Sequence, residues 1–162
     1  MRTPSIRPAT LSDVGRLVAL ETDSFASDRL SLRSFRRFVR SPTAILRVLG
    51  DGAETYGYYL LLVRARSQVA RLYSIALDRR HRGRGLGAAL IADAEAAAGH
   101  RGLARLSLEV RDDNLPAVGL YERLGYEFKG RLPDYYADGA DARRYEKRLS
   151  RPSSGSSHEA DG

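Results

Sequence analysis

The chain has 162 residues with an apolar content of 43%, which is typical of a soluble globular protein with one core rather than two. It contains no cysteine and only three widely spaced histidines, which excludes disulfides, thiolate metal sites and a cysteine nucleophile and argues against zinc. The net charge of +7 and the pI near 10.0 would attract a polyanion, but charge alone is weak evidence for nucleic-acid binding.

The N-terminal half of the chain combines helical and strand-like segments. It opens without the apolar core of a signal peptide, and no apolar run is long enough to cross a bilayer, so we expect a cytoplasmic protein that does not bind a membrane. Ser12 or Asp13 can cap the first helix. The elements predicted in this half are a strand over 5–8, helices over 11–25 and 31–39, and a hairpin of strands over 44–49 and 55–63 around Asp51-Gly52.

The middle of the chain carries the most informative pattern, a buried strand over 69–77, a glycine-rich turn and an alanine-rich helix over 85–98. The turn contains three glycines and four arginines, which are Gly83, Gly85, Gly87, Arg79, Arg80, Arg82 and Arg84. Amide groups at a helix N-terminus have no intrahelical partners and lie at the positive end of the helix dipole. Glycine lets a ligand approach the backbone closely, so this turn predicts a phosphate-binding site.

Two common phosphate-binding motifs do not match this turn. A P-loop requires lysine and then serine or threonine after its last glycine, whereas Gly87 is followed by Ala88 and Ala89. The dinucleotide-binding fingerprint has the spacing G-x-G-x-x-G, whereas the spacing here is G-x-G-x-G. A basic, glycine-rich surface loop without a ligand is the alternative interpretation.

The C-terminal half predicts further strands and one helix. Residues 103–110 alternate as a strand with one apolar face, and residues 114–124 have helical spacing that ends at Gly125. Two closing strands over 126–131 and 144–149 flank a turn at Asp138-Gly139. We therefore expect one domain over 1–149 and a disordered polar tail over 150–162.

Several motifs resemble one family. The pattern Arg82-x-x-Gly85-x-Gly87 resembles the pyrophosphate-binding signature of the GCN5-related N-acetyltransferases, which bind acetyl-coenzyme A. The segment 106–126, with Glu109, Asn114 and Tyr121, resembles the RimI-type ribosomal-protein N-terminal-alanine acetyltransferases, as does Tyr135-Tyr136-Ala137-Asp138-Gly139. The resemblance implies an α/β (α+β) fold, with a mixed, mostly antiparallel sheet of about seven strands, helices on both faces, and strands four and five splayed apart.

The resemblance also implies roles for individual residues. Glu109 would accept the proton of the attacking amine, directly or through water, and Tyr121 would return a proton to the coenzyme sulfur. An amide of the strand before the turn could stabilise the oxyanion. Residues implied to bind acetyl-coenzyme A are Ile75, Ala76, Leu77, Arg82, Gly83, Arg84, Gly85, Leu86, Gly87, Asn114 and Ala117. Residues implied to contact the acceptor are Phe25, Asp28, Tyr135 and Tyr136. No metal and no covalent enzyme intermediate is implied.

Each of these roles has a structural alternative. Glu109 could pair with Arg111 or another arginine, and Tyr121 could pack in the core with its hydroxyl bonded. Tyr135 and Tyr136 could be aromatic residues of a sheet edge. Acidic residues near the first helix, which are Glu21, Asp23 and Asp28, could attract a cationic amine or be ordinary surface charges.

The acceptor amine is the least determined part of the prediction. A peptide α-amine with a pKa near 8 is about a tenth neutral at pH 7, whereas a lysine amine with a pKa near 10.4 is neutral far more rarely. The difference in the free energy of deprotonation is roughly 3 kcal/mol and favours an α-amine as the acceptor. The hypothesis is acetyl transfer to a protein or peptide N-terminus, with association to the ribosome as a further expectation. Alternatives are a small-molecule amine or lysine acetyltransferase and a non-catalytic acyl-coenzyme A-binding module. A monomer and a homodimer are equally compatible with the sequence.

Overall fold

The computed structural model describes residues 3–150, so nearly all of the expected tail lies outside the described residues. The strands are β1 (Ser5–Pro8), β2 (Ala44–Gly50), β3 (Thr55–Val63), β4 (Val69–Leu77), β5 (Arg105–Arg111), β6 (Glu127–Leu132) and β7 (Ala142–Arg148). The helices are α1 (Val14–Ser24), α2 (Leu32–Arg40), α3 (Leu86–His100) and α4 (Leu115–Arg123), with short 3₁₀ turns at Leu11–Asp13 and Arg79–His81.

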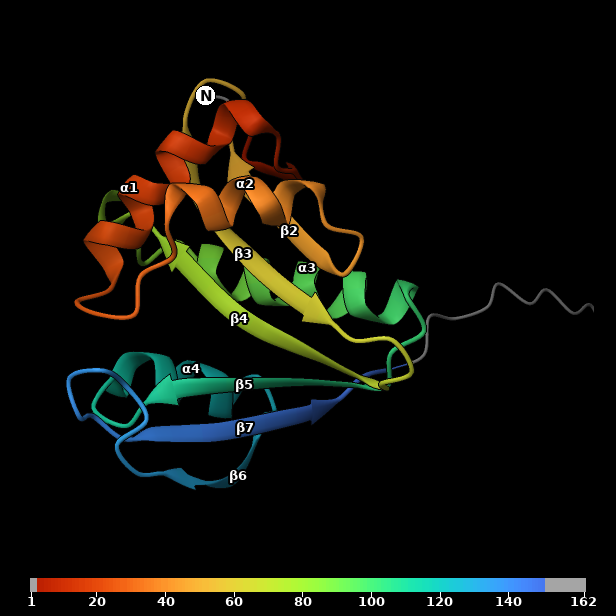
Figure 1. Ribbon diagram of the computed structural model, residues 1–162, viewed down its shortest axis with the longest axis vertical. Coiled ribbons are helices and arrows are strands. Elements are labelled where there is room, and N and C mark those ends of the chain that lie inside the picture. The colour runs from red at the N-terminus through yellow and green to blue at the C-terminus, as the bar shows by residue number, and fades with distance from the viewer. Residues whose placement is uncertain (1–2, 151–162) are drawn as a thin grey trace, which may run out of the picture.

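The seven strands form one sheet in the order β1-β2-β3-β4-β5-β7-β6 (Figure 1). All neighbouring strands are antiparallel except β4 and β5, which are parallel and are connected through α3. This architecture confirms the fold class that the sequence predicts.

The element boundaries differ from the prediction at several ends. The first predicted helix begins as a 3₁₀ turn and stops at Ser24, because Phe25 adopts an extended conformation. The N-cap of this first turn is Thr10, whose amide donates to the Asp13 carboxylate at 2.8 Å, so neither Ser12 nor Asp13 caps the helix with its side chain as expected. Ser31 caps α2 as expected, since its hydroxyl accepts the Ser34 amide at 3.1 Å.

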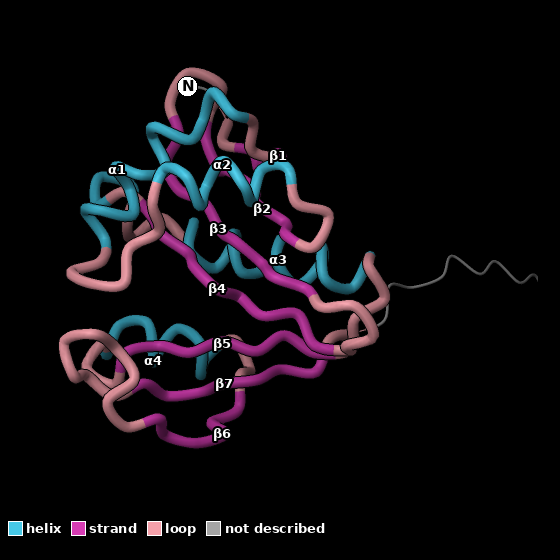
Figure 2. Tube along the Cα trace, in the orientation of Figure 1, coloured by secondary structure: helices cyan, strands magenta, loops and turns pink. Residues whose placement is uncertain are grey.

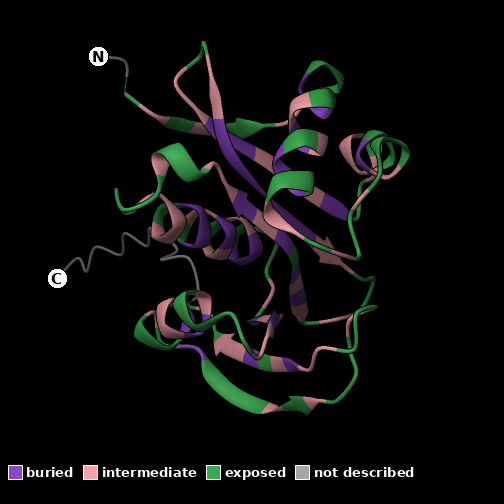
Figure 3. Cartoon of the chain, turned by 90° about the vertical axis from the view of Figure 1, so that its left-hand side faces the viewer, coloured by how far each residue is buried: buried purple, intermediate pink, exposed green. Residues whose placement is uncertain are grey.

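Helices cover both faces of the sheet, and each face has its own core (Figure 3). On one face α1 and α2 pack on β2 and β3 through Leu17, Phe35 and Tyr58, all fully buried. On the other face α3 and α4 pack on β3, β4, β5 and β7, around Leu90 and other buried residues. No helix within residues 3–150 is long and apolar enough to span a bilayer.

The sheet opens in its middle because β4 contains a bulge. Leu60 pairs with Ser74 while its neighbour Leu61 pairs with Leu72, so Tyr73 is an extra residue without a partner on β3. A bulge bends its strand and increases the local twist. The parallel pairing of β4 with β5 ends at Leu72 and Leu108, and beyond that point the two strands diverge (Figure 2).

Candidate active site

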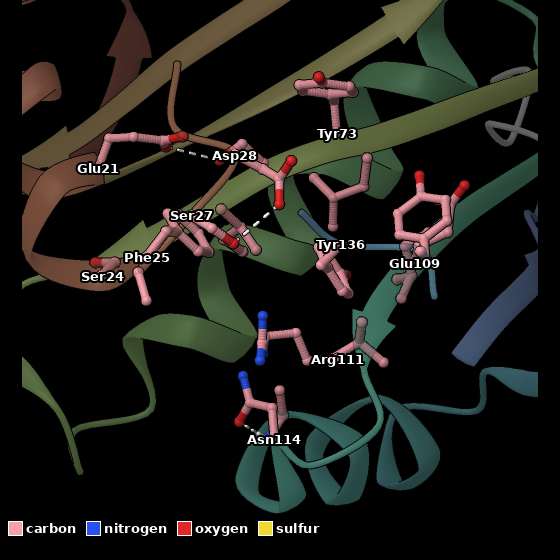
Figure 4. A pocket seen from close by; sticks show the side chains of 18 of the residues that line it. Glu21, Ser24, Phe25, Ser27, Asp28, Tyr73, Glu109, Arg111, Asn114 and Tyr136 are labelled. Atoms are coloured by element: carbon pink, nitrogen blue, oxygen red, sulfur yellow. Dashed lines mark hydrogen bonds between the residues drawn. The ribbon is translucent and has the colours of Figure 1, made fainter. Parts of the chain in front are cut away.

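A pocket of about 620 Å³ lies where β4 and β5 diverge. Its walls come from the two separating strands, from the start of α4, and from the α1–α2 and β6–β7 connections (Figure 4). Nine of the residues to which the family resemblance gives a role line it, together with Glu21, and the nine are Phe25, Asp28, Ile75, Glu109, Asn114, Ala117, Tyr121, Tyr135 and Tyr136. The fold therefore gathers side chains from five separate segments of the chain.

The edge of β4 beside the pocket has unused backbone groups. The amide of Asp78 donates to the carbonyl of Tyr56 on β3 at 2.7 Å. Hydrogen-bonded pairs alternate along an antiparallel ladder, so Ala76 also directs its backbone groups to β3. Ile75 and Leu77 direct their backbone groups to the other edge of β4, where β5 no longer pairs with it. An extended ligand can bind there like an added strand, at Ile75 and Leu77 but not through the backbone of Ala76.

The glycine-rich turn follows β4 and leads into α3. Gly83 and Gly85 have φ angles of 79° and 76°, and a side chain added at either would meet no other atom within 4 Å. The amides of residues 83–88 donate no hydrogen bond to any part of the chain that the structure describes, whereas the Arg82 amide donates to Arg79 at 3.3 Å. Open space above a row of free amides at a helix N-terminus fits a diphosphate.

The arginines of this turn differ in position. The Arg84 guanidinium donates to His81 Nδ1 at 2.8 Å and lies over the Tyr56 ring at 5.7 Å, which holds it beside the turn. Arg82 is exposed, and Leu86 is half-buried against the core around α3. None of these turn residues lines the pocket, so β4 is the element that connects the pocket with the turn.

We expect Gly85→Ala to weaken coenzyme binding. An alanine at a φ of 76° costs about 1–2 kcal/mol, and relaxation of that strain would turn the free amides away from the ligand. The dissociation constant for coenzyme A, measured by isothermal titration calorimetry, should rise roughly tenfold. Gly102→Ala is the matched control, because Gly102 has a φ of 79° in open space just beyond the opposite end of α3 and should lose stability without losing affinity.

Glu109 is held at the mouth of the pocket by two arginines. Its side chain is 8% exposed, and Oε1 lies 3.2 Å from Arg71 and 3.2 Å from Arg144. The sequence analysis considered pairing with Arg111 or another arginine, and the partners are others, because Arg111 pairs with Asp138 at 2.8 Å and with Asp113 at 3.3 Å. The ion pairs involve one oxygen of Glu109, which leaves Oε2 as the oxygen that can receive a proton.

Tyr121 projects from α4 into the other side of the pocket. It is 6% exposed, and its ring packs edge-on against Tyr126 with centroids 5.6 Å apart. Its hydroxyl forms no hydrogen bond within residues 3–150, unlike that of Tyr126, which donates to Glu95 at 2.8 Å. Burial, and to a lesser extent Tyr136, raises the pKa of Tyr121, so its hydroxyl carries a proton at neutral pH.

Two loops meet over the acceptor side of the pocket. The Asp28 carboxylate accepts the Ala137 amide at 2.9 Å, which ties the α1–α2 loop to the β6–β7 connection. Tyr135 and Tyr136 belong to that connection and stack edge-to-face with centroids 4.9 Å apart, so they are not sheet-edge residues. Burial raises the pKa of Tyr136 to about 12.

Glu21, which the sequence analysis considered as an attractor of a cationic amine or as a surface charge, is a buried residue of the pocket lining. Glu21 is 2% exposed and accepts hydrogen bonds from the Tyr58 hydroxyl, from the Ser74 hydroxyl at 3.1 Å and from the Leu30 amide at 2.8 Å. Its interpretation as a surface charge is wrong. Glu21 links the acceptor loop to β3 and to β4 just after the bulge, and no sequence pattern indicates these three partners.

The sequence analysis missed Arg71 and Tyr73, which line the pocket. The Arg71 guanidinium donates to the Tyr135 hydroxyl at 2.7 Å, contacts Glu109 and lies over the Tyr73 ring at 5.1 Å. Its Nε is buried and has no hydrogen-bond partner among the described residues. The alternation of buried and exposed residues along β4 could have placed Arg71 on the side away from the core. The position of Tyr73 could not have been predicted, because the bulge there cannot be recognised from the sequence.

Asn114 and Ala117 stand where α4 opens into the pocket. The Asn114 side chain accepts the Ala117 amide at 3.3 Å and caps the helix. The side-chain amide of Asn114 has donors left, so the capping role is compatible with contact to a ligand.

Comparison with known proteins agrees with this geometry. A family model described as acetyltransferase (GNAT) family matches residues 16–126, which is more than half of the chain and includes β4, the glycine-rich turn, Glu109 and Tyr121. The chain belongs to the GNAT acetyltransferase family. It is therefore an acetyltransferase that uses acetyl-coenzyme A, which confirms the enzyme class predicted from the sequence.

Relatives within the GNAT family include proteins named as alanine N-acetyltransferases of a ribosomal protein. A Bacillus subtilis protein, provisionally named a ribosomal protein bS18-alanine N-acetyltransferase, is 30% identical over 85% of this chain and 91% of its own length. The crystal structure of the Escherichia coli ribosomal-protein-S18-alanine N-acetyltransferase has a TM-score of 0.81 and 25% identity, covering 96% of this chain and 100% of that one. A Salmonella typhimurium acetyltransferase solved with its cofactor acetyl-coenzyme A has the same fold, with a TM-score of 0.79 and 15% identity over 96% and 99% of the two chains.

Proposed function

We propose that this GNAT enzyme acetylates the N-terminal α-amine of a protein or peptide by direct attack in a ternary complex. The observation that carries the proposal is the convergence of a buried carboxylate, Glu109, and an unbonded tyrosine hydroxyl, Tyr121, in one pocket beside the free edge of β4. The B. subtilis and E. coli relatives, which are named as alanine N-acetyltransferases of a ribosomal protein, support it.

The residues that bind and orient the coenzyme lie at the start of α4, along β4 and in the glycine-rich turn that β4 connects to the pocket. The free amides of residues 83–88 hold the diphosphate, and Ile75, Leu77 and Asn114 hold the arm that follows it. Bound acetyl-coenzyme A supplies the acetyl thioester. A free amide near the β4 bulge can donate to the thioester oxygen as negative charge develops on it.

The acceptor side positions the amine and removes its proton. Arg71 and Arg144 fix Glu109, whose Oε2 accepts the proton of the attacking amine, directly or through water. Tyr121 donates its proton to the leaving sulfur, because its raised pKa keeps the hydroxyl protonated until the thiolate forms. Phe25, Asp28, Tyr135 and Tyr136 line the entry of the acceptor.

The acceptor side of the pocket is restrained by two loops. The tie between Asp28 and Ala137 restrains the two loops above the acceptor side, and Tyr136 narrows the same space. An α-amine is also the easier nucleophile, since its pKa near 8 leaves about a tenth of it neutral at pH 7. The difference in amine pKa favours an N-terminus over a lysine side chain.

An acceptor panel tests this proposal. With acetyl-coenzyme A, the enzyme should acetylate peptides with free N-termini at a kcat/KM at least about tenfold above that for polyamines, aminoglycosides or N-terminally blocked lysine peptides, as read by mass spectrometry. Faster transfer to a small amine or to a blocked lysine peptide would contradict it. Coenzyme binding without transfer to any acceptor would favour a non-catalytic acyl-coenzyme A-binding module.

A further inference from the structure

Helix α2 carries an arginine stripe on its outer surface. Arg33, Arg36, Arg37 and Arg40 are all exposed and stand at spacing i, i+3, i+4 and i+7, which places them in one row along the helix. The row is about 10 Å long, from seven steps of 1.5 Å. Phe35 on the opposite side is fully buried, so the orientation of the helix is fixed by its core face.

The stripe has no negative partner in the described residues. None of its four arginines forms an ion pair or a side-chain hydrogen bond there, whereas most arginines on the sheet do. No aspartate or glutamate occurs between Asp28 and Asp51. Arg37 and Arg40 lie in the last turn, where the helix dipole favours cations, but Arg33 and Arg36 do not. Like charges four residues apart destabilise a helix by about 0.2–0.5 kcal/mol per pair, so helix stability does not account for the whole stripe.

Further exposed arginines lie at the C-terminal end of α2. The Arg101 side chain donates to the Pro42 carbonyl at 2.9 Å, and the Val63 amide donates to the Thr43 carbonyl at 2.9 Å, which brings the β3–β4 turn with Arg64 and Arg66 to the same end. These three arginines also lack ion pairs within residues 3–150. The positive charge therefore continues beyond the helix.

We propose that the α2 stripe binds the phosphate backbone of double-helical RNA and places the pocket beside an RNA-associated acceptor protein. Guanidinium groups bind phosphate with two parallel hydrogen bonds and lose less hydration than ammonium groups, so they are suited to this ligand. The stripe has no exposed aromatic ring for stacking on bases, which favours a duplex backbone over a single strand and sequence-independent contact.

The position of α2 connects this surface to the acceptor site. The helix begins at Leu32, directly after the α1–α2 loop that lines the pocket through Phe25 and Asp28 (Figure 1). The choice of RNA rests on the proposed function, because the relatives named above act on a ribosomal protein. The positive surface itself is independent of the acetylation reaction.

A salt titration of RNA binding tests the inference. Fluorescence anisotropy with a labelled short RNA duplex would compare the wild-type chain with Arg33→Gln/Arg36→Gln/Arg37→Gln/Arg40→Gln between about 50 and 200 mM salt. Four phosphate contacts contribute a slope of roughly −3.6 in log K against log salt, which the variant should lose together with roughly tenfold or more in affinity at the lowest salt. An Arg→Lys variant at the same four positions keeps the charge and should keep most of the slope.

The matched control removes the same charge elsewhere. Arg105→Gln/Arg123→Gln/Lys129→Gln/Arg148→Gln also lowers the net charge from +7 to +3, on exposed positions of β5, α4, β6 and β7. It should bind RNA nearly as well as the wild type. Equal losses in both variants, or equally tight binding to polyglutamate or to anionic lipid vesicles, would overturn the inference.

Peptide acetylation separates this inference from the proposed function. The stripe variant should acetylate a short peptide at the wild-type kcat/KM, which also shows that it is folded. If no peptide is acetylated by any form while RNA binding still depends on the stripe, the proposed function fails and the RNA surface stands. If peptides are acetylated and RNA does not bind, the proposed function stands and the inference fails.

Discussion

Replacement of Glu109 by glutamine should lower kcat for a peptide N-terminus by roughly 10²–10³-fold, because the amide that replaces Oε2 cannot accept the proton of the attacking amine. KM for acetyl-coenzyme A should change little, since the glycine-rich turn lies outside the pocket that Glu109 lines. The residual rate should rise as the pH approaches the α-amine pKa near 8, because more of the amine is then neutral without a base to deprotonate it. Steady-state kinetics over a pH series would measure both effects.

Glu146→Gln is the control for that substitution. Glu146 lies on the same face of the sheet, on β7, and pairs with Arg105 at 3.0 Å, but it does not line the pocket. It should retain nearly the full kcat. A Glu109→Gln enzyme with wild-type turnover would remove this carboxylate from the mechanism and leave it as the partner of Arg71 and Arg144 only.

Replacement of Tyr121 by phenylalanine should lower kcat by roughly 10²-fold with little change in either KM. The ring keeps its packing against Tyr126, and its hydroxyl has no hydrogen bond within residues 3–150 to lose. The free energy of unfolding should therefore change by less than about 0.5 kcal/mol. Steady-state kinetics and denaturant unfolding on the same preparation would measure the lowered kcat and the nearly unchanged free energy of unfolding.

Tyr126→Phe should give the opposite result. Its hydroxyl donates to Glu95 at 2.8 Å, so its removal should cost about 1 kcal/mol of stability and leave kcat close to the wild-type value. If Tyr121→Phe turned over at the wild-type rate, a different group or water would have to protonate the leaving sulfur.

The acceptor side is built differently from the coenzyme side. The free amides of residues 83–88 come from one continuous turn, whereas Glu109, Tyr121 and Tyr136 come from a strand, a helix and a loop. The ties that assemble them are long-range in sequence, such as Asp28 with Ala137 and Arg71 with Glu109. Substitutions at these long-range contacts should affect the reaction with the acceptor more than they affect coenzyme binding.

The sequence by itself determined the features that depend on local pattern. Alternation and helical spacing predicted the strands and helices to within a few residues, and the G-x-G-x-G turn between β4 and α3 predicted free amides at a helix N-terminus. These features follow from hydrophobic periodicity and from backbone groups that lack partners, both of which are encoded within a few neighbouring residues.

Only the tertiary structure decided which side chains meet. The bulge at Tyr73 reverses the alternation of β4, opens the sheet, and orients Ile75 and Leu77 rather than Ala76 toward the free edge. Burial of Glu21 with its three donors, and the choice of Arg71 and Arg144 over Arg111 as partners of Glu109, depend on contacts between distant segments. Such contacts arise from packing across the whole sheet, and local sequence carries no periodic signal for them.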